Sequence, residues 1–136
     1  MSYDKKLIIH KLERWDRFIT NYHLPDWDSI PDLGLYMDQV VVLLVQYLGF
    51  IPSIPGGKES FVPSSAINNY VRLKIMPAPV KRKYYRVHIA YLIMILTMKQ
   101  SISISDVQKI LPADSSEDCV RSVYEAYSEK FRQLAL

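Results

Sequence analysis

Polar and basic side chains between Ser65 and Arg86 offer the chemistry with which proteins contact nucleic acid. The amide of Asn68 can bond bidentately to adenine, and the guanidinium of Arg72 can bond bidentately to guanine. Ser65 can serve a base edge or a phosphate, while Asn69, nearer the edge of this face, is expected to touch the nucleic-acid backbone. The basic residues that follow and suit phosphate contacts are Lys74, Lys81, Arg82, Lys83 and Arg86.

The charge of the chain is distributed unevenly along the sequence. Residues 60–105 contain seven Lys or Arg residues and no Asp or Glu, whereas the segments before and after each carry a net charge of −2. The whole chain has a formal net charge of +3. A basic block between two acidic flanks is typical of a surface that binds a polyanion. The alternative interpretation is a solvated face without acids.

The sequence lacks the usual residue patterns of an enzyme or a metal site. His10, His23 and His88 are isolated, and none has a second ligand at metal-binding spacing within its own segment. Cys119 is the single cysteine and has no neighbouring base in the sequence. Residues 56–58, Gly-Gly-Lys, lack the earlier glycine and the following Ser or Thr of a phosphate-binding loop. We therefore expect no catalytic residue, no metal and no cofactor.

Length and composition indicate one domain over residues 1–136. The hydrophobic share of 49% is that of an ordinary globular domain. A single cysteine and an N-terminus without a signal-peptide pattern lead us to expect a cytoplasmic protein. The longest apolar run, Ile89–Met98, is about half as long as a bilayer span. It predicts a buried helix, and we expect no membrane association.

Apolar periodicity, capping residues and prolines predict an all-α fold. The expected helices cover residues 5–22, 36–48, 64–76, 86–99, 103–111 and 115–136. Residues 24–35 are expected to form a surface connector, because two prolines and a glycine interrupt them and three Asp residues keep them polar. Residues 49–58 are expected to form a loop. Ser103, with Asp106 three residues later, predicts the N-cap of the short helix that follows.

The order of these elements is that of a winged helix-turn-helix. A helix with a polar outer face is followed by a proline-ended turn, the basic segment Lys81–Arg86, a buried helix and a capped short helix. In such a fold the polar helix enters the major groove of DNA, and the basic wing beside it holds phosphates.

Parts of the sequence resemble the DNA-binding domain of the MerR-type regulators. Within residues 62–111, the similar parts are Ile67–Pro77, Tyr84 with Ile89 and Leu92, and Ser103–Val107. The resemblance implies a winged helix-turn-helix over residues 36–111, preceded by an N-terminal helix and connector and followed by a C-terminal helix from residue 112. It makes Tyr84 the wing tyrosine. Lys74 stands where that family has a glycine in the left-handed conformation, and residues 49–62 lengthen the connection between the two helices.

The whole chain, including the connector, resembles a bacterial family of unknown function that is common in low-GC Gram-positive bacteria and is regarded as regulatory. We therefore expect a sequence-specific regulator that binds double-stranded DNA and has no enzymatic activity. A protein-interaction adaptor that keeps the fold without the DNA contact is the alternative. The residues expected to contact DNA are Ser65, Asn68, Asn69, Arg72, Lys74, Lys81, Arg82, Lys83, Tyr84 and Arg86. The sequence specifies neither the operator nor any small-molecule effector.

Two apolar surfaces predict a homodimer. Ile89–Met98 is apolar on all sides, which is more than a helix covered on one side can bury. The last helix adds a seam of apolar residues at alternating spacings of four and three, formed by Val120, Tyr124, Tyr127, Phe131 and Leu134. A dimer would also suit two half-sites of a palindromic operator. The alternative is a monomer in which residues 5–22 cover the seam.

Overall fold

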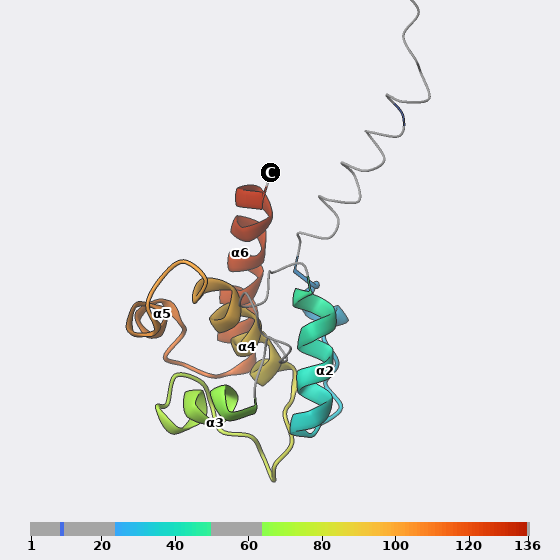
Figure 1. The fold of residues 1–136 in the computed structure, drawn as a ribbon, viewed down its shortest axis with the longest axis vertical. Coiled ribbons are helices and arrows are strands. Elements are labelled where there is room, and N and C mark those ends of the chain that lie inside the picture. Colours follow the sequence, from blue (N-terminus) through green and yellow to red (C-terminus); the bar gives the residue numbers. More distant parts are fainter. Residues whose placement is uncertain (1–8, 10–23, 50–63, 136) are drawn as a thin grey trace, which may run out of the picture.

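The longest apolar run of the sequence forms the central helix of the fold. The computed structural model of the chain describes Ile9, residues 24–49 and residues 64–135. Helix α4 spans Arg86–Met98, and its residues 88–97 are all buried. Helices α2, α5 and α6 pack around it (Figure 1). The buried helix expected over residues 86–99 is therefore confirmed.

Helix α2 packs against α4 and also contacts α3. It spans Met37–Leu48 and buries Val40, Leu44 and Leu48, which repeat every four residues and so share one helix face. This agrees with the helix expected over residues 36–48. Helix α3 spans Ser64–Arg72, so it ends before the expected boundary at Met76. The reason is a change of backbone conformation after its last turn, described below.

Helices α5, Ile104–Ile110, and α6, Glu117–Ala135, complete the bundle. The backbone N–H of Asp106 donates to Ser103 Oγ at 3.3 Å, so the N-cap read from the sequence is confirmed. Helix α6 packs along α4 and buries Val120 and Tyr124. Both helices lie within the ranges expected for them.

Residues 24–35 contribute to the core, which corrects the expectation of a surface connector. Trp27–Ser29 form a short 3-10 helix, η1, that packs against α6. The side chains of Leu24, Trp27 and Ile30 are at most 2% exposed, whereas the three Asp residues remain exposed. The prolines therefore set the path of the backbone, and the apolar side chains between the acids still turn inward.

No β-strand forms in the described ranges, and the fold class is all-α as expected. Two isolated antiparallel bridges join Val80 to Lys83 and Leu35 to Tyr84. The first bridge closes a minimal hairpin shortly before α4, which we call the wing and define as residues 80–83, and the second joins the residue after the wing to the connector. Apart from Ile9, the helix expected over residues 5–22 lies outside the described residues. So does the loop expected over residues 49–58 beyond its first residue.

Candidate nucleic-acid interface

Helix α3 presents a polar face to solvent and an apolar face to the core. Its exposed residues include Ser65, Asn68, Asn69 and Arg72. Ile67 and Tyr70 are buried on the opposite face. The hydroxyl of Tyr70 accepts a hydrogen bond from Lys99 Nζ at 2.9 Å, and the ammonium lies 5.6 Å from the centroid of the ring. This contact ties α3 to the end of α4 and fixes which face points outward.

Two polar residues of α3 bond to each other. Arg72 Nη2 donates to Asn69 Oδ1 at 2.5 Å, across one turn of the helix. The bond holds the guanidinium along the exposed face, which lowers the entropy that Arg72 would lose on binding. The structure therefore gives Asn69 a role in orienting Arg72, which the sequence pattern did not reveal.

Helix α3 ends in a left-handed turn at Lys74. The N–H of Ile75 donates to the carbonyl of Tyr70 at 3.0 Å. The N–H of Lys74 donates to the carbonyl of Val71, also at 3.0 Å. These two bonds form a Schellman cap, whose left-handed residue is usually glycine. Lys74 has a φ of +60°, so an exposed lysine occupies this strained position and stops the helix before Met76.

The wing is a tight turn with two cations at its tip. Val80 and Lys83 exchange backbone hydrogen bonds of 3.0 and 2.9 Å. Between them, Lys81 and Arg82 have φ values of +50° and +66°. Positive φ at both central residues is the mark of a type I′ turn, which strongly prefers Asn-Gly. Keeping two residues with side chains in this region costs about 1–3 kcal/mol each.

Tyr84 and Arg86 lie at the base of the wing and not on its surface. Tyr84 is 3% exposed, and burial raises the pKa of its hydroxyl. Arg86 Nε donates to the carbonyl of Ile30 at 2.7 Å, and the guanidinium lies 5.9 Å from the centroid of Trp27. Both side chains attach the wing to the connector. Tyr84 is therefore removed from the expected set of DNA-contacting residues, whereas a DNA contact of the half-buried Arg86 stays a prediction.

The remaining cations of this region keep their charge free of acidic partners. Among the described residues, no acidic partner is found for Arg72, Lys74, Lys81 and Arg82, nor for Lys99 at the end of α4 or Lys130 and Arg132 of α6. The ion pairs found there all use cations of α5 and α6. Lys83 is half-buried, with its ammonium 5.9 Å from the ring centroid of Tyr36.

Helix α3 and the wing lie at the same end of the molecule, opposite the C-terminal end of α6 (Figure 1). We call the expected DNA-contacting side chains of α3, of its C-terminal cap and of the wing the α3–wing surface; Lys83 is half-buried and the others are exposed. It consists of Ser65, Asn68, Asn69, Arg72, Lys74, Lys81, Arg82 and Lys83.

A comparison with protein-family models assigns the chain to a family. Residues 25–130 match the family described as Domain of unknown function (DUF1836). The chain belongs to the DUF1836 family. The match includes the whole α3–wing surface, and it confirms the expected likeness to a family of unknown function. No curated protein and no solved structure matches the DUF1836 chain.

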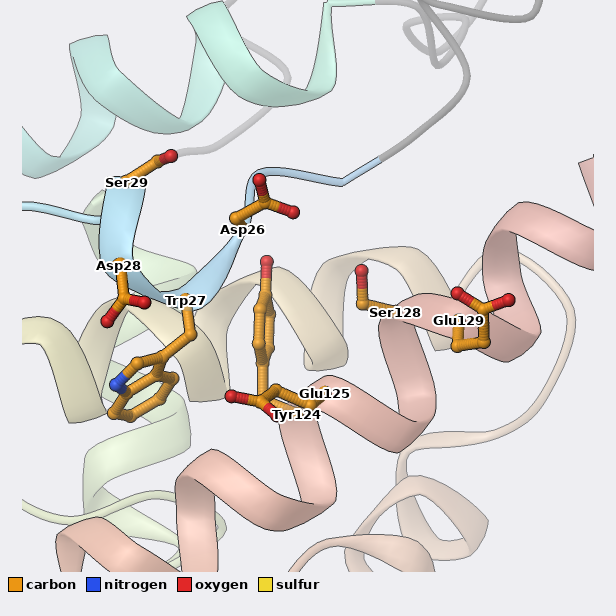
Figure 2. Close-up of a pocket in the computed structure, with 8 residues that line it drawn as sticks. All are labelled: Asp26, Trp27, Asp28, Ser29, Tyr124, Glu125, Ser128 and Glu129. Atoms are coloured by element: carbon orange, nitrogen blue, oxygen red, sulfur yellow. The ribbon is translucent and has the colours of Figure 1, made fainter.

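A pocket between η1 and α6 of the DUF1836 chain has the opposite charge to the wing. It encloses about 480 Å³, and Figure 2 shows acidic side chains along it from both elements. The residues that line it are Asp26, Trp27, Asp28, Ser29, Tyr124, Glu125, Ser128 and Glu129. Arg121 Nε lies 2.7 Å from Glu125 Oε1, and Arg121 Nη2 lies 3.7 Å from Asp28 Oδ2. Because carboxylates repel phosphates, this pocket is not part of the candidate interface.

The two apolar surfaces expected to form a dimer are largely covered within one DUF1836 chain. Residues 89–97 of α4 are buried on all sides by the helices around them. In the seam of α6, Val120 and Tyr124 are at most 1% exposed, and the hydroxyl of Tyr127 shares a 2.5 Å hydrogen bond with Thr97 Oγ1. The homodimer stays a prediction, and Val120 and Tyr124 of the expected seam are not exposed for it.

The described residues contain neither a metal-binding cluster nor a membrane-spanning helix. Among the residues that the structure describes, no group of three or more His, Cys, Asp or Glu side chains could hold a metal ion. In the same ranges, no helix of the DUF1836 chain is long and apolar enough to cross a membrane. Of the three histidines, His88 lies within these ranges and is buried.

Proposed function

We propose that this DUF1836 chain is a sequence-specific DNA-binding regulator of transcription, built on a MerR-like winged helix-turn-helix. Helix α3 serves as the recognition helix in the major groove, and the wing contacts phosphates of the backbone. The proposal involves no catalytic step, metal or cofactor. It puts the protein in the bacterial cytoplasm, together with the chromosome.

The observation that carries the proposal is the pair of strained, unneutralised cations at the tip of the wing. An Asn-Gly turn would fit the backbone of residues 81 and 82 with less strain. Lys81 and Arg82 instead hold two positive charges outward, with no acid in residues 60–105 to neutralise them. Strained backbone that is kept at an exposed, charged tip supports a role in binding a polyanion.

Helix α3 supplies the groups that would distinguish bases. Asn68 and Arg72 can make bidentate bonds to adenine and guanine in the major groove. The bond from Arg72 to Asn69 holds the guanidinium on this face before DNA arrives. The wing contacts would carry no base information, because phosphates are the same at every position. The two parts of the surface therefore have separable effects on specificity and on affinity.

The test is the binding of the purified protein to a fluorescent duplex of random sequence while the salt concentration is raised. Each phosphate contact contributes roughly −0.9 to the slope of log K against log salt. If most of the five cations of the α3–wing surface contact phosphates, the slope should be about −3 to −4.5. Absence of binding at low salt would refute the proposal and favour the protein-interaction adaptor.

A matched pair of double variants locates the contacts. Lys81→Ala with Arg82→Ala should reduce the magnitude of the slope by about 2, because two phosphate contacts are lost. Lys130→Ala with Arg132→Ala removes the same charge from exposed positions of α6 and should leave the slope unchanged. Equal slopes for the two double variants would show that net charge alone drives the binding, without a specific surface.

The proposal includes a homodimer on a palindromic operator. Exposed apolar residues such as Val42 and Val45 of α2, which are 59% and 40% exposed, offer one contact surface for it. Sedimentation equilibrium of the free protein and of the complex with a selected operator tests this part. The mass of a single chain in both samples would refute the dimer while leaving the DNA contact standing.

A further inference from the structure

His88 joins the two ends of the wing. The residue stands in the first turn of α4 and is 6% exposed. Its Nδ1 accepts a hydrogen bond from the backbone N–H of Tyr85 at 2.9 Å. Its Nε2 lies 2.9 Å from the carbonyl oxygen of Ala78. Ala78 precedes the wing and Tyr85 follows it, so one imidazole ring holds both sides of the turn.

The two partners of His88 fix its protonation state. The N–H of Tyr85 is a donor, so Nδ1 must keep its lone pair, and the carbonyl of Ala78 is an acceptor, so Nε2 must carry the proton. The neutral imidazole protonated at Nε2 satisfies both requirements. An imidazolium carries a proton on each nitrogen and therefore cannot accept the bond from Tyr85.

Helix α2 begins with the same arrangement but without a titratable group. There the N–H of Tyr36 donates to Oε1 of Gln39 at 2.9 Å, with the same separation of three residues. Glutamine and histidine therefore serve equally as the acceptor in this position. A histidine differs from a glutamine in that protonation abolishes its acceptor, so the start of α4 can respond to pH and the start of α2 cannot.

We propose that neutral His88 is the positioning residue of the wing, and that its protonation releases the wing and weakens the binding of DNA. The inference rests on the proposed function, because it concerns how the wing is presented to DNA phosphates. Loss of the Tyr85 bond leaves the C-terminal side of the turn held by the backbone bridge between Tyr84 and Leu35 alone on that side of Tyr85, and Lys81 and Arg82 are then presented to DNA less rigidly.

The surroundings of His88 favour the neutral form near neutral pH. Burial lowers the pKa of His88 below its usual value of 6.5, while the hydrogen bond to Ala78 and the charge of Asp32 act in the opposite direction with smaller effects. The other titratable or charged groups that face it or line the same cavity of about 340 Å³ are Tyr84, Tyr85, Arg86 and Glu117. Because the folded state binds the proton more weakly than the unfolded state, stability falls as the pH drops below about 6.5.

The sign of the predicted effect on binding is unusual. Acidification adds positive charge to a protein, and this alone strengthens its attraction to DNA. Release of the wing acts in the opposite direction, because it removes phosphate contacts. A decrease in affinity on acidification is therefore a signature of the wing and not of net charge.

The experiment compares the full-length wild-type protein with His88→Gln and His88→Ala. Dissociation constants for one 20-base-pair duplex are measured from pH 8 to pH 5 at constant ionic strength, with circular dichroism to confirm that the helices persist. Nitrogen-15 NMR of the free protein follows the protonation of His88 and the amides of Lys83 and Tyr85. We expect wild-type affinity to fall about tenfold as His88 protonates, the loss that follows from one or two phosphate contacts. The wing amides should lose protection over the same pH range.

The two variants distinguish the effect of the His88 hydrogen bonds on the wing from a general effect of pH. His88→Gln keeps an acceptor for Tyr85, as Gln39 does in α2, so its affinity should not fall on acidification. His88→Ala should bind weakly at every pH. If wild type binds DNA equally well when NMR shows His88 protonated, the inference is overturned while the proposed function stands. If neither the wild-type protein nor either variant binds DNA at pH 8 and low salt, the proposed function fails. The NMR measurement then still shows whether His88 holds the wing.

Discussion

The wing and the acidic pocket between η1 and α6 differ in whether their charged side chains form ion pairs. At the pocket, the guanidinium of Arg121 lies within 4 Å of the carboxylates of both Asp28 and Glu125, so these surface ion pairs neutralise part of the acidic charge. At the wing, Lys81 and Arg82 have no acidic partner among the described residues. Charges that already pair with each other attract a binding partner less strongly, whereas the unpaired charges on a strained turn remain available to bind one. The comparison therefore favours the wing over the pocket for the proposed contact with DNA.

The two regions rest on one shared residue. Trp27 lies 5.9 Å from the guanidinium of Arg86 at the base of the wing and 6.0 Å from the ring of Tyr124 in α6. The wing and the pocket therefore differ in what they present to solvent, while their support is common. Disruption of Trp27 should affect both regions, and disruption of either surface should leave the other intact.

The largest expected effect is on stability. Trp27→Ala should lower the free energy of unfolding by about 3–5 kcal/mol, because the side chain is 2% exposed and leaves a cavity. Chemical denaturation followed by circular dichroism measures this loss. Trp27→Phe keeps an aromatic ring and serves as the milder control. A loss below about 1 kcal/mol for the alanine variant would show that the connector is not an integral part of the core.

A charge reversal should have the next largest effect, on DNA binding. Lys81→Glu with Arg82→Glu should weaken binding about a hundredfold at moderate salt, because two phosphate contacts become repulsions. Arg121→Glu with Lys109→Glu places the same negative charge where the cations already have acidic partners and should change binding far less. Comparable losses for the two double variants would remove the distinction between paired and unpaired cations.

Changes on α3 should affect specificity. Asn68→Ala or Arg72→Ala should each cost roughly 1–3 kcal/mol on a selected site and relax the preference for the base that it contacts. Asn69→Ala should have a smaller effect, through the freed guanidinium of Arg72. Binding to a selected and a scrambled duplex measures the ratio. An unchanged ratio in both Asn68→Ala and Arg72→Ala would mean that α3 is not a recognition helix.

The smallest expected effect has opposite signs on stability and binding. Lys81→Asn with Arg82→Gly suits a type I′ turn and should raise the free energy of unfolding by about 1–2 kcal/mol. The same change should weaken DNA binding, because it removes both cations from the tip. Lys74→Gly is the control, because it relieves the strain of a left-handed residue outside the wing and should also raise the free energy of unfolding. A turn variant that is less stable than wild type would contradict the strain assigned to Lys81 and Arg82.

Several features of the site could be predicted from local sequence because they depend on neighbours along one helix. The spacing of Ile67 and Tyr70 predicts which face of α3 is buried, and hence that Asn68 and Arg72 are exposed. The continuous apolar run predicts the central helix, and Ser103 predicts the start of α5. Each of these features is decided by side-chain period or by a hydrogen bond across one turn, both of which are visible in the sequence.

Other features were decided by contacts between distant segments. Arg86 and Tyr84 read as surface residues of a basic segment, but Arg86 bonds to Ile30, 56 residues earlier, and Tyr84 forms a backbone bridge with Leu35. The same contacts bring Trp27 into the core and set His88 between the two ends of the wing. Local sequence alone determined helices α2, α4, α5 and α6 and the basic character of residues 60–105. The tertiary structure decided which of those cations stay exposed, because an inward-facing arginine is stable where a distant carbonyl accepts its hydrogen bond.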